Sequence, residues 1–514
     1  MKTKLISFLF NTTLYKAVCV CVFILVPSIV FCFFQQVISA VLLLWGAVIL
    51  LHDLFSKKNF SKSIGSIILF LFVLGYTGTL IFYVKEDVLS TFNVFFWAIV
   101  QFFLLFAIDC REKKDISALF KELHLINFPV TVVMLITGVL SLICFVAKIA
   151  VVMPDPEGLN KYWSMGIVNG RNSGIFNNPI PCASAMFIGC IAAALNLFYS
   201  ANKKSNRIFY IISYIVGFLC IQTTLTRTYV YGIYLFSAVA AFVGFFQYGR
   251  TRFKGAKKFL ISFGSMFLVA GVLIATGQVT KSGMAAIVEK RETTSILLDV
   301  GKMNNSDDNK SIEEIQKEIS DSLALDKDVT LSRDEISRLP SFFFPRDELW
   351  KVALQVIPHS PVFGFTTGNL AASSLEYGHT EYFENNWATG IPTYHNGYVD
   401  IAVSAGLLGL ALMLSFLLIQ IIQTLKVIFG HSLPDTSARV SFGYGIMTAF
   451  LAVHVLFISL FFGTLTFCNL AVCLYFWIVM GYTSRINEIV LSCKGYLSIE
   501  TVINSIKKVC ARHA

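Results

Sequence analysis

Long apolar segments alternate with short polar ones along the chain, and this pattern gives the first indication of the fold. A helix crosses the hydrocarbon core of a bilayer in about 20 mostly apolar residues. We predict twelve such membrane-spanning helices, at 17–35, 37–51, 64–84, 88–108, 129–153, 180–200, 208–225, 229–246, 259–277, 399–422, 440–462 and 465–482. The second of these is short, and the break at Gln35 and Gln36 before it is the least distinct boundary.

The polar segments divide this predicted all-α polytopic membrane protein. We expect nine helices in 1–277, one large loop at 278–398, three helices in 399–482 and a tail at 483–514. No small-residue cleavage site precedes further apolar sequence near the N-terminus, so we interpret the first span as a retained anchor. The tail alternates apolar and basic residues, which predicts an amphipathic helix on anionic lipid. A contact within an assembly is the alternative for the tail.

Composition and charge placement agree with lipid as the solvent. Of the 514 residues, 56% are hydrophobic and 14% are charged, whereas soluble domains run at roughly 45–50% apolar and about 25% charged. The net charge of +10 is typical of some nucleic-acid-binding proteins, but 25 of the 41 Lys and Arg lie on one side of the predicted spans. Only five lie on the other side, outside the large loop. The positive-inside rule then places both termini in the cytoplasm and the large loop outside, with the bilayer rather than nucleic acid as partner.

The cysteines fit this orientation. All 12 lie in predicted spans or cytoplasmic segments, and none lies in the large loop, where an oxidising compartment would favour disulfides. The sequence contains neither a Cys-x-x-Cys pair nor a His-Glu-x-x-His zinc motif. We therefore expect no redox pair, no zinc site of that kind and no cofactor.

The large loop has two parts of different composition. The part at 285–340 is charged and polar, and we interpret it as a solvated insertion with a surface helix at 311–325. The part at 342–398 is rich in aromatic residues and punctuated by Gly and Pro. Aromatic rings beside polar groups are typical of sugar-binding surfaces, although an aromatic belt at the membrane interface is the alternative reading.

Three arginines stand out on the predicted outer face, where cations are scarce. Arg227 lies in a very short hinge between two spans, Arg171 lies just before another span, and Arg346 lies at the start of the aromatic part of the large loop. Arginine presents a rigid fork of donors that matches phosphate. Together the three predict a metal-free pyrophosphate site. The alternative is that each reaches lipid headgroups or caps a helix end.

A histidine on the same face is the candidate base. His395 directly precedes a predicted span, and a neutral imidazole accepts a proton at working pH. Asp400 at the start of that span is a candidate to orient the ring, but five residues is an awkward helical spacing. His454 is the only histidine within a span, and we expect it to be a satisfied core residue.

These residues lie in motifs that resemble the O-antigen ligase and O-antigen polymerase superfamily of bacterial envelope glycosyltransferases. HNGYVDIAVSAGLLG has the form His-Asn, nine residues, Gly-x-x-Gly, with His395, Asn396, Gly406 and Gly409. RDELWKVALQVIPHSPVFGFTTGNL resembles the stretch that precedes this signature in the family. RNSGIFNNPIPCA and TLTRTYVYG resemble its two upstream Arg-containing segments. The matching order covers about 165–410, and the insertion at 285–340 is not carried over.

The resemblance implies a lipid-carrier glycosyltransferase, with an all-helical GT-C-like membrane architecture in the bacterial inner membrane. Its donor would be a glycan on polyprenyl pyrophosphate, and its acceptor another glycan or lipid A-core. By the resemblance, His395 matches the proposed general base, Arg227 and Arg346 match phosphate-contacting arginines, and Arg171 matches less securely. Metal is not expected.

Within the family, the polymerase and ligase activities stay open, as does transfer of glycan to protein. We lean to a polymerase, because the broad loop offers room for a second lipid-linked glycan. A flippase or transporter of lipid-linked oligosaccharide is the alternative from another class. Transporters usually carry ionisable residues within spans and often show internal repeats, and this chain shows almost none of the former and no repeated half.

Overall fold

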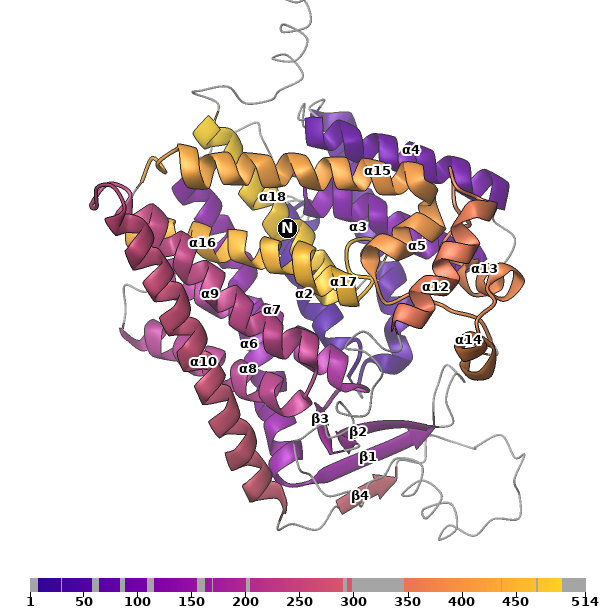
Figure 1. Ribbon diagram of the computed structural model, residues 1–514, viewed down its shortest axis with the longest axis horizontal. Coiled ribbons are helices and arrows are strands. Elements are labelled where there is room, and N and C mark those ends of the chain that lie inside the picture. The colour runs from indigo at the N-terminus through magenta and orange to yellow at the C-terminus, as the bar shows by residue number, and fades with distance from the viewer. Residues whose placement is uncertain are drawn as a thin grey trace, which may run out of the picture.

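The computed structural model describes residues 8–28, 30–57, 64–83, 88–108, 115–154, 162–168, 170–199, 204–289, 294–297, 346–387, 389–435, 437–467 and 470–491. These residues form a bundle of long helices with a small sheet (Figure 1). The long helices have these bounds: α2 (Thr12–Leu25), α3 (Gln35–Lys57), α4 (Ile64–Tyr83), α5 (Val88–Val100), α6 (Ile116–Val146), α7 (Pro179–Tyr199), α8 (Lys204–Thr224), α9 (Arg227–Gly249), α10 (Lys257–Glu289), α15 (Gly397–Leu425), α16 (Ala438–Val453) and α18 (Ala471–Leu491).

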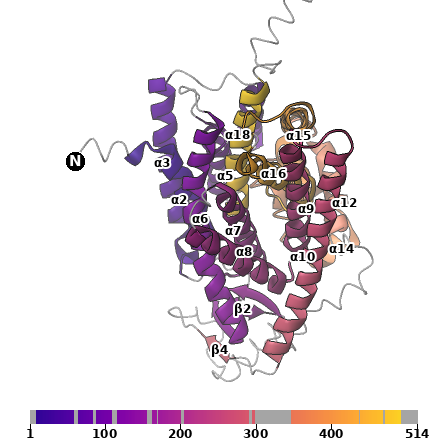
Figure 2. The same ribbon diagram turned by 90° about the vertical axis from the view of Figure 1, so that its left-hand side faces the viewer.

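The helices are those of a multi-pass membrane protein. Nine helices among the described residues are long and apolar enough to cross a membrane, and Thr12–Leu25 and Thr91–Leu105 are shorter apolar helices. Each of the twelve predicted apolar segments overlaps a helix in the structure. Figure 2 shows α3 and α10 on opposite flanks of the bundle. The helical multi-pass architecture is therefore confirmed, and the number of twelve spans stays a prediction.

The first predicted span, at 17–35, is wrong as a continuous helix. Helix α2 ends at Leu25, and a short 3-10 helix follows at Cys32–Phe34. Pro27 lies between them, and proline has no N–H for a helical hydrogen bond. Its carbonyl accepts instead from the N–H of Asn177, 3.0 Å away. The chain therefore leaves the helix here to pair with a distant segment.

Three other predicted spans also have boundaries that differ from the structure. Helix α6 begins thirteen residues before 129, and it ends at Val146 rather than at 153. Helix α10 continues past 277 to Glu289, and α18 continues past 482 to Leu491. Polar residues follow the apolar runs in α10 and α18, and a hydropathy pattern does not reveal whether a helix continues into them.

A four-stranded sheet follows α6, where the sequence predicted only helix and loop. Its strands are β1 (Ile149–Pro154), β2 (Tyr162–Val168), β3 (Arg171–Gly174) and β4 (Thr294–Leu297), in the order β3-β2-β1-β4. β1 pairs antiparallel with β2 and parallel with β4. Figure 1 shows this sheet beside the end of α10. The start of the large loop is thereby joined to the segment between α6 and α7.

The later part of the large loop forms its own small core. Helix α12 (Arg346–Val356) buries one stripe, which includes Leu349, Val352 and Val356 at the spacing of an amphipathic helix. This stripe packs with residues of α13 (Leu370–Tyr377) and α14 (Glu381–Asn386) and with Val403 of α15. Figure 1 shows α12, α13 and α14 gathered at the beginning of α15. We call this part of the molecule the His395 end.

Two expectations lie outside the described residues. The predicted surface helix at 311–325 and most of the predicted amphipathic tail, from 492 onward, belong to them. Both stay predictions.

Candidate functional site

His395 lies in the loop between α14 and α15, with an unusual backbone conformation. Its φ is 51°, in the left-handed region that non-glycine residues rarely adopt. The side chain is partly buried, and burial together with the positive charge of Arg346 lowers the pKa of His395 from 6.5 to about 4. The imidazole is therefore neutral at pH 7, and a neutral ring can accept a proton.

The loop around His395 is held by Asp400, which lies in the first turn of α15. One carboxylate oxygen accepts from the N–H of Tyr394 at 2.7 Å, and the other accepts from the hydroxyl of Thr393 at 2.9 Å. The Thr393 hydroxyl oxygen in turn accepts from the N–H of His395 at 3.2 Å. We expected Asp400 to orient the imidazole of His395. Its hydrogen bonds go instead to Thr393 and to the backbone of Tyr394. The five-residue spacing directs the carboxylate to the backbone of the loop.

Asn396 begins α15 and holds the other side of His395. Its side-chain oxygen accepts from the N–H of Tyr398 at 3.0 Å and from that of Val399 at 3.3 Å. This is the hydrogen bonding of a helix N-cap, for which Asn is among the best residues. The residue next to His395 thus fixes where α15 begins.

Helix α12 brings Arg346 to His395. Arg346 is the first residue of α12, and Trp350, one turn later, lies on the same face. The indole N–H of Trp350 donates to the carbonyl of Tyr394 at 3.1 Å. The guanidinium of Arg346 lies over the rings of Phe461 and Phe462, at 5.4 Å and 5.7 Å from their centroids. Trp350 therefore holds the His395 loop by a hydrogen bond, and the charge of Arg346 acts on the His395 imidazole.

Arg171 contacts the hinge between α8 and α9 that precedes Arg227. Arg171, in β3, donates from Nε to the carbonyl of Thr224 at 3.0 Å and from Nη2 to the hydroxyl of Thr226 at 3.2 Å. Thr226 is the N-cap of α9, and Arg227 is its first residue. Arg171 therefore holds the hinge that presents Arg227, at a helix N-terminus where the backbone dipole also favours anions.

A stack of rings connects this hinge to Arg346. Tyr229, two residues after Arg227, stacks on Phe462 with ring centroids 5.8 Å apart. Phe462 is one of the two rings beneath Arg346. The contacts thus form one connected series from Arg171 through the start of α9 to Arg346 and His395. Arg346 and His395 are close enough to interact electrostatically, and Arg227 joins them through neighbouring residues.

The two glycines of the Gly-x-x-Gly motif shape α15. Gly406 has φ 70° and ψ 180°, which kinks the helix. Next to it, Gly364 has φ 74°, and a Cβ on Gly406 would collide with the carbonyl of Val362. The N–H of Phe365 donates to the carbonyl of Val403 at 2.9 Å in the same contact. Gly406 therefore lets the segment after α12 pair directly with α15.

Gly409 has a different environment. A Cβ there would approach Ala405, and it would lie 3.5 Å from the ring of Phe72 in α4. Its small size matches the close packing of α15 against α4, a pattern common between membrane helices. Gly409 supports the site only through this helix packing.

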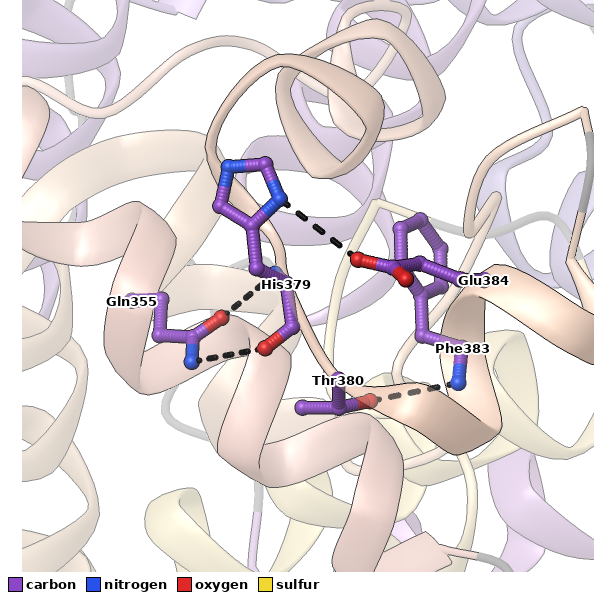
Figure 3. A network of polar contacts seen from close by, with 5 residues as sticks. All are labelled: Gln355, His379, Thr380, Phe383 and Glu384. Atoms are coloured by element: carbon purple, nitrogen blue, oxygen red, sulfur yellow. Dashed lines mark hydrogen bonds and ion pairs between the residues drawn. The ribbon is translucent and has the colours of Figure 1, made fainter.

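Polar contacts also hold α12, α13 and α14 together. Figure 3 shows the Gln355 amide bonded to both backbone groups of His379, accepting from its N–H at 2.7 Å and donating to its carbonyl at 3.2 Å. Thr380 then caps α14 by accepting from the N–H of Phe383 at 3.2 Å. The His379 ring lies 3.8 Å from the carboxylate of Glu384 (Figure 3). These contacts fix the chain that leads into the His395 loop.

Several positioning residues were not among the candidates from the sequence. They are Trp350, Thr393, Tyr229, Phe461 and Phe462. For Trp350 a signal was present, because it lies four residues after Arg346 on a short amphipathic helix. For the others no local pattern exists, since each meets the site through the fold. His454, in contrast, is buried and bonds through Nε2 to the carbonyl of Thr464 at 3.1 Å, which confirms its position in the core. Its buried Nδ1 has no hydrogen-bond partner among the described residues, so the expectation of a fully satisfied ring is not met.

The described residues contain no group of three or more His, Cys, Asp and Glu side chains placed to hold a metal ion. What they do bring together is the imidazole of His395 and the guanidinium of Arg346. Such a set can accept a proton and bind an anion.

Comparison with known proteins agrees with the motifs. The sequence model of the O-antigen ligase family matches residues 212–414, a segment that includes Arg227, Arg346, His395, Gly406 and Gly409 but not Arg171. No curated protein matches the chain. The family match implies a glycosyltransferase-type membrane enzyme that acts on glycan and lipid-linked substrates. Residues 212–414 of the chain are therefore similar to the O-antigen ligase family.

Proposed function

We propose that this chain transfers a glycan from polyprenyl pyrophosphate to an acceptor hydroxyl at the outer leaflet of the bacterial inner membrane, without a metal. The observation that carries the proposal is the placement of Arg346 beside a neutral His395, on a loop that α12 and Asp400 hold in position. The imidazole of His395 can accept the proton of an alcohol, and the guanidinium of Arg346 can bind a phosphate.

In the proposed reaction, His395 accepts the proton of the acceptor hydroxyl while its oxygen forms a bond to the anomeric carbon of the donor. The bond between that carbon and the pyrophosphate oxygen breaks, and polyprenyl pyrophosphate leaves with the electron pair. A positioned general base contributes on the order of 10²–10⁴ in rate. Direct attack of this kind inverts the anomeric configuration.

The leaving group is already an anion, so it needs cationic binding more than it needs a proton. Arg346 and Arg227 bind the pyrophosphate in this proposal, and each charged hydrogen bond contributes about 1.5–3 kcal/mol. Arg171 acts one step away, since its Nε and Nη2 hydrogen bonds go to the hinge that presents Arg227. We assign it as a positioning residue.

The same arrangement couples donor binding to the strength of the base. Arg346 helps to lower the pKa of His395. A bound pyrophosphate offsets the positive charge of Arg346, and the pKa of His395 then rises toward its ordinary value. His395 becomes a stronger base when a donor is present.

The proposed orientation follows from charge. The excess of Lys and Arg in the loops of the predicted inner side supports an orientation with both termini in the cytoplasm and the site outside. In this orientation twelve helices span the membrane, in the architecture of lipid-carrier glycosyltransferases. The aromatic part of the large loop then faces the compartment that holds the acceptor glycan.

Between the family activities we favour a polymerase, with a ligase that uses lipid A-core as the runner-up. Glycan profiles of a deletion strain distinguish the two. Single repeats on the surface indicate a lost polymerase, and lipid-linked polymer beside bare acceptor indicates a lost ligase. Transfer of glycan to protein, or transport of lipid-linked glycan without a new glycosidic bond, would appear as a different product in reconstituted vesicles.

The central test replaces His395 with Asn. Asn also tolerates a positive φ, so His395→Asn removes the base with the least disturbance of the backbone. Transfer from purified lipid-linked donor in vesicles should fall by about 10²–10⁴ while the yield of folded protein is unchanged. The matched control is His379→Asn, on the exposed part of the same loop region. Full activity of His395→Asn, or loss of wild-type activity on chelation of divalent metal, would contradict the proposal.

A further inference from the structure

A cavity lies between α9, α15 and α16. Its volume is 360 Å³, within the range of small-molecule sites. Apolar side chains form almost all of its wall, among them Val239, Phe242, Leu417, Ile421, Ala452 and Leu456. Thr448, one of the few polar residues there, donates its hydroxyl hydrogen bond to its own helix, at the carbonyl of Tyr444. The cavity therefore suits a hydrocarbon chain and offers little to a polar ligand.

Hydrogen bonds join the end of α9 to residues beside the cavity. Gln247 donates to the carbonyls of Val427 and Ile428 at 3.1 Å and 2.9 Å. Arg250 donates to the carbonyls of Ile428 and His431 through one nitrogen and to that of Phe429 through another, at 2.9–3.0 Å. Ile428 and Phe429 themselves line the cavity. These bonds hold the end of α9 against the short helix Lys426–Gly430 that continues α15.

On α9, a row of residues leads from Arg227 to the cavity. Residues four apart on a helix form such a row. After Arg227 come Tyr231 and Leu235, which are 48% and 44% exposed, and then Val239 at the cavity wall. Arg227 is thus the first member of an exposed, largely apolar ridge.

A second row faces it along α16 and its continuation. Leu460 and Leu456 are 39% and 64% exposed, and Ala452 follows at the cavity wall. Leu460 is next to Phe461, one of the rings beneath Arg346. α9 and α16 pack side by side. The two rows therefore lie on neighbouring helices and end in the same cavity. One begins at Arg227, and the other begins at Leu460, the residue before Phe461.

We propose that the two rows and the cavity bind the isoprenoid chain of the lipid-linked donor. We call them the chain track. This inference rests on the proposed function, because it takes the two arginines as the site of the pyrophosphate. The chain track then holds the first isoprene units of the carrier, and the remainder of the chain lies in the bilayer.

The length of the chain track makes the proposal quantitative. Twelve residues of α9 separate Arg227 from Val239, or about 18 Å at 1.5 Å per residue. The chain of geranyl pyrophosphate, with seven C–C bonds of about 1.5 Å along its backbone, spans at most about 11 Å and stops above the cavity. Undecaprenyl pyrophosphate is long enough to fill it. Inside a bilayer the gain comes from packing rather than from leaving water, so a shape match should decide affinity.

The test measures binding of geranyl pyrophosphate, undecaprenyl pyrophosphate and phosphatidylglycerol to the full chain in detergent, by native mass spectrometry. We expect undecaprenyl pyrophosphate to bind at least about tenfold more tightly than the other two. Ala452→Trp fills the cavity, and Leu235→Trp narrows the row above it. Each should remove most of that preference and leave binding of geranyl pyrophosphate unchanged. Ala275→Trp, on the exposed face of α10, is the matched control and should behave like wild type.

The outcomes separate this inference from the proposed function. A long-chain preference that is lost in both Trp variants supports the chain track even if no glycan transfer is found. Equal affinity for the short and long pyrophosphates, or a preference that survives both variants, overturns it. Phosphatidylglycerol that binds as tightly as undecaprenyl pyrophosphate also overturns it, because the cavity would then hold ordinary bilayer lipid.

Discussion

The indole of Trp350 donates to the carbonyl of Tyr394, 3.1 Å away, and so ties α12 to the residue before His395. Arg346 lies one helical turn before Trp350 on the same face. This hydrogen bond therefore helps to set how the arginine and the histidine approach each other. This relationship makes Trp350 a positioning residue that can be tested apart from the chemistry.

Trp350→Phe keeps an aromatic ring on α12 and removes the N–H donor. We expect glycan transfer to fall by about tenfold, because one hydrogen bond contributes about 0.5–1.5 kcal/mol and the His395 loop loses its anchor. The turnover rate kcat should fall more than the KM for donor rises. Trp45→Phe is the control, since its indole makes a similar bond to the carbonyl of Leu9 far from the site. If glycan transfer fell equally in the two variants, the hydrogen bond of Trp350 would have no specific role in positioning the site.

The pH dependence of transfer should report the Arg346–His395 pair. The pKa of His395 is lowered to about 4, so the free enzyme keeps its base neutral down to about that pH, and kcat/KM falls below it. Arg346→Gln removes the positive charge, and the acidic limb of the residual activity should move to higher pH. The profile of kcat/KM from pH 4 to 8 measures this shift. If the acidic limb of the kcat/KM profile stayed at the same pH in Arg346→Gln, Arg346 would not influence the pKa of His395.

The same pKa predicts the direction of a stability change. Because the folded pKa of His395 is lower than the unfolded value, the unfolded chain binds more protons between about pH 4 and 6.5. This contribution to stability is therefore complete above about 6.5 and is lost as the pH falls through that window. His395→Asn should show a smaller drop in melting temperature from pH 7 to 4.5 than wild type does in the same detergent. A larger drop in melting temperature in the variant than in wild type would contradict a lowered pKa of His395 in the folded protein.

Asp400→Asn tests whether the carboxylate of Asp400 holds the His395 loop in position. An amide keeps one acceptor oxygen where the carboxylate uses both, for Thr393 and for the N–H of Tyr394. We expect transfer to fall by about tenfold with little change in the KM for donor, since Asp400 holds the His395 loop. Asp115→Asn changes another carboxylate that accepts a backbone N–H, at the start of α6, and should have no effect. Wild-type kcat for Asp400→Asn is the result that would exclude this role.

Arg227→Lys tests recognition by a fork of donors. An ammonium carries the charge but cannot make two parallel bonds to a phosphate. The loss of about 1.5–3 kcal/mol corresponds to a fall in kcat/KM of about ten- to hundredfold. Arg252→Lys, near the far end of α9, is the control. If the two variants matched in kcat/KM, Arg227 would not bind the donor through its fork.

Gly406→Ala tests the kink of α15. A methyl group there would meet the carbonyl of Val362, at a φ of 70° that costs a non-glycine residue about 1–3 kcal/mol. The melting temperature in detergent should fall, and transfer should be lost with it. Gly430→Ala, which has open space around it, should leave both unchanged. A stable and active Gly406→Ala protein would show that the kink can relax.

The sequence by itself determined the membrane helices, because lipid requires long apolar segments whose backbone bonds are satisfied internally. It also indicated His395, Arg227 and Arg346 as candidates, since an imidazole and guanidinium groups are conspicuous on a predicted outer face with few cations. These properties are local. They can be read from single segments without knowing which segments meet.

Only the tertiary structure decided the contacts between distant segments. The pairing of β4 with β1 joins residues more than 140 positions apart, and the break after Leu25 depends on a partner near Asn177. Asp400 serves the backbone of its loop rather than the imidazole, and Arg171 serves the hinge before Arg227. Each outcome depends on which polar group lies within hydrogen-bond reach once the helices have packed. The spacing of residues along one chain does not contain that information.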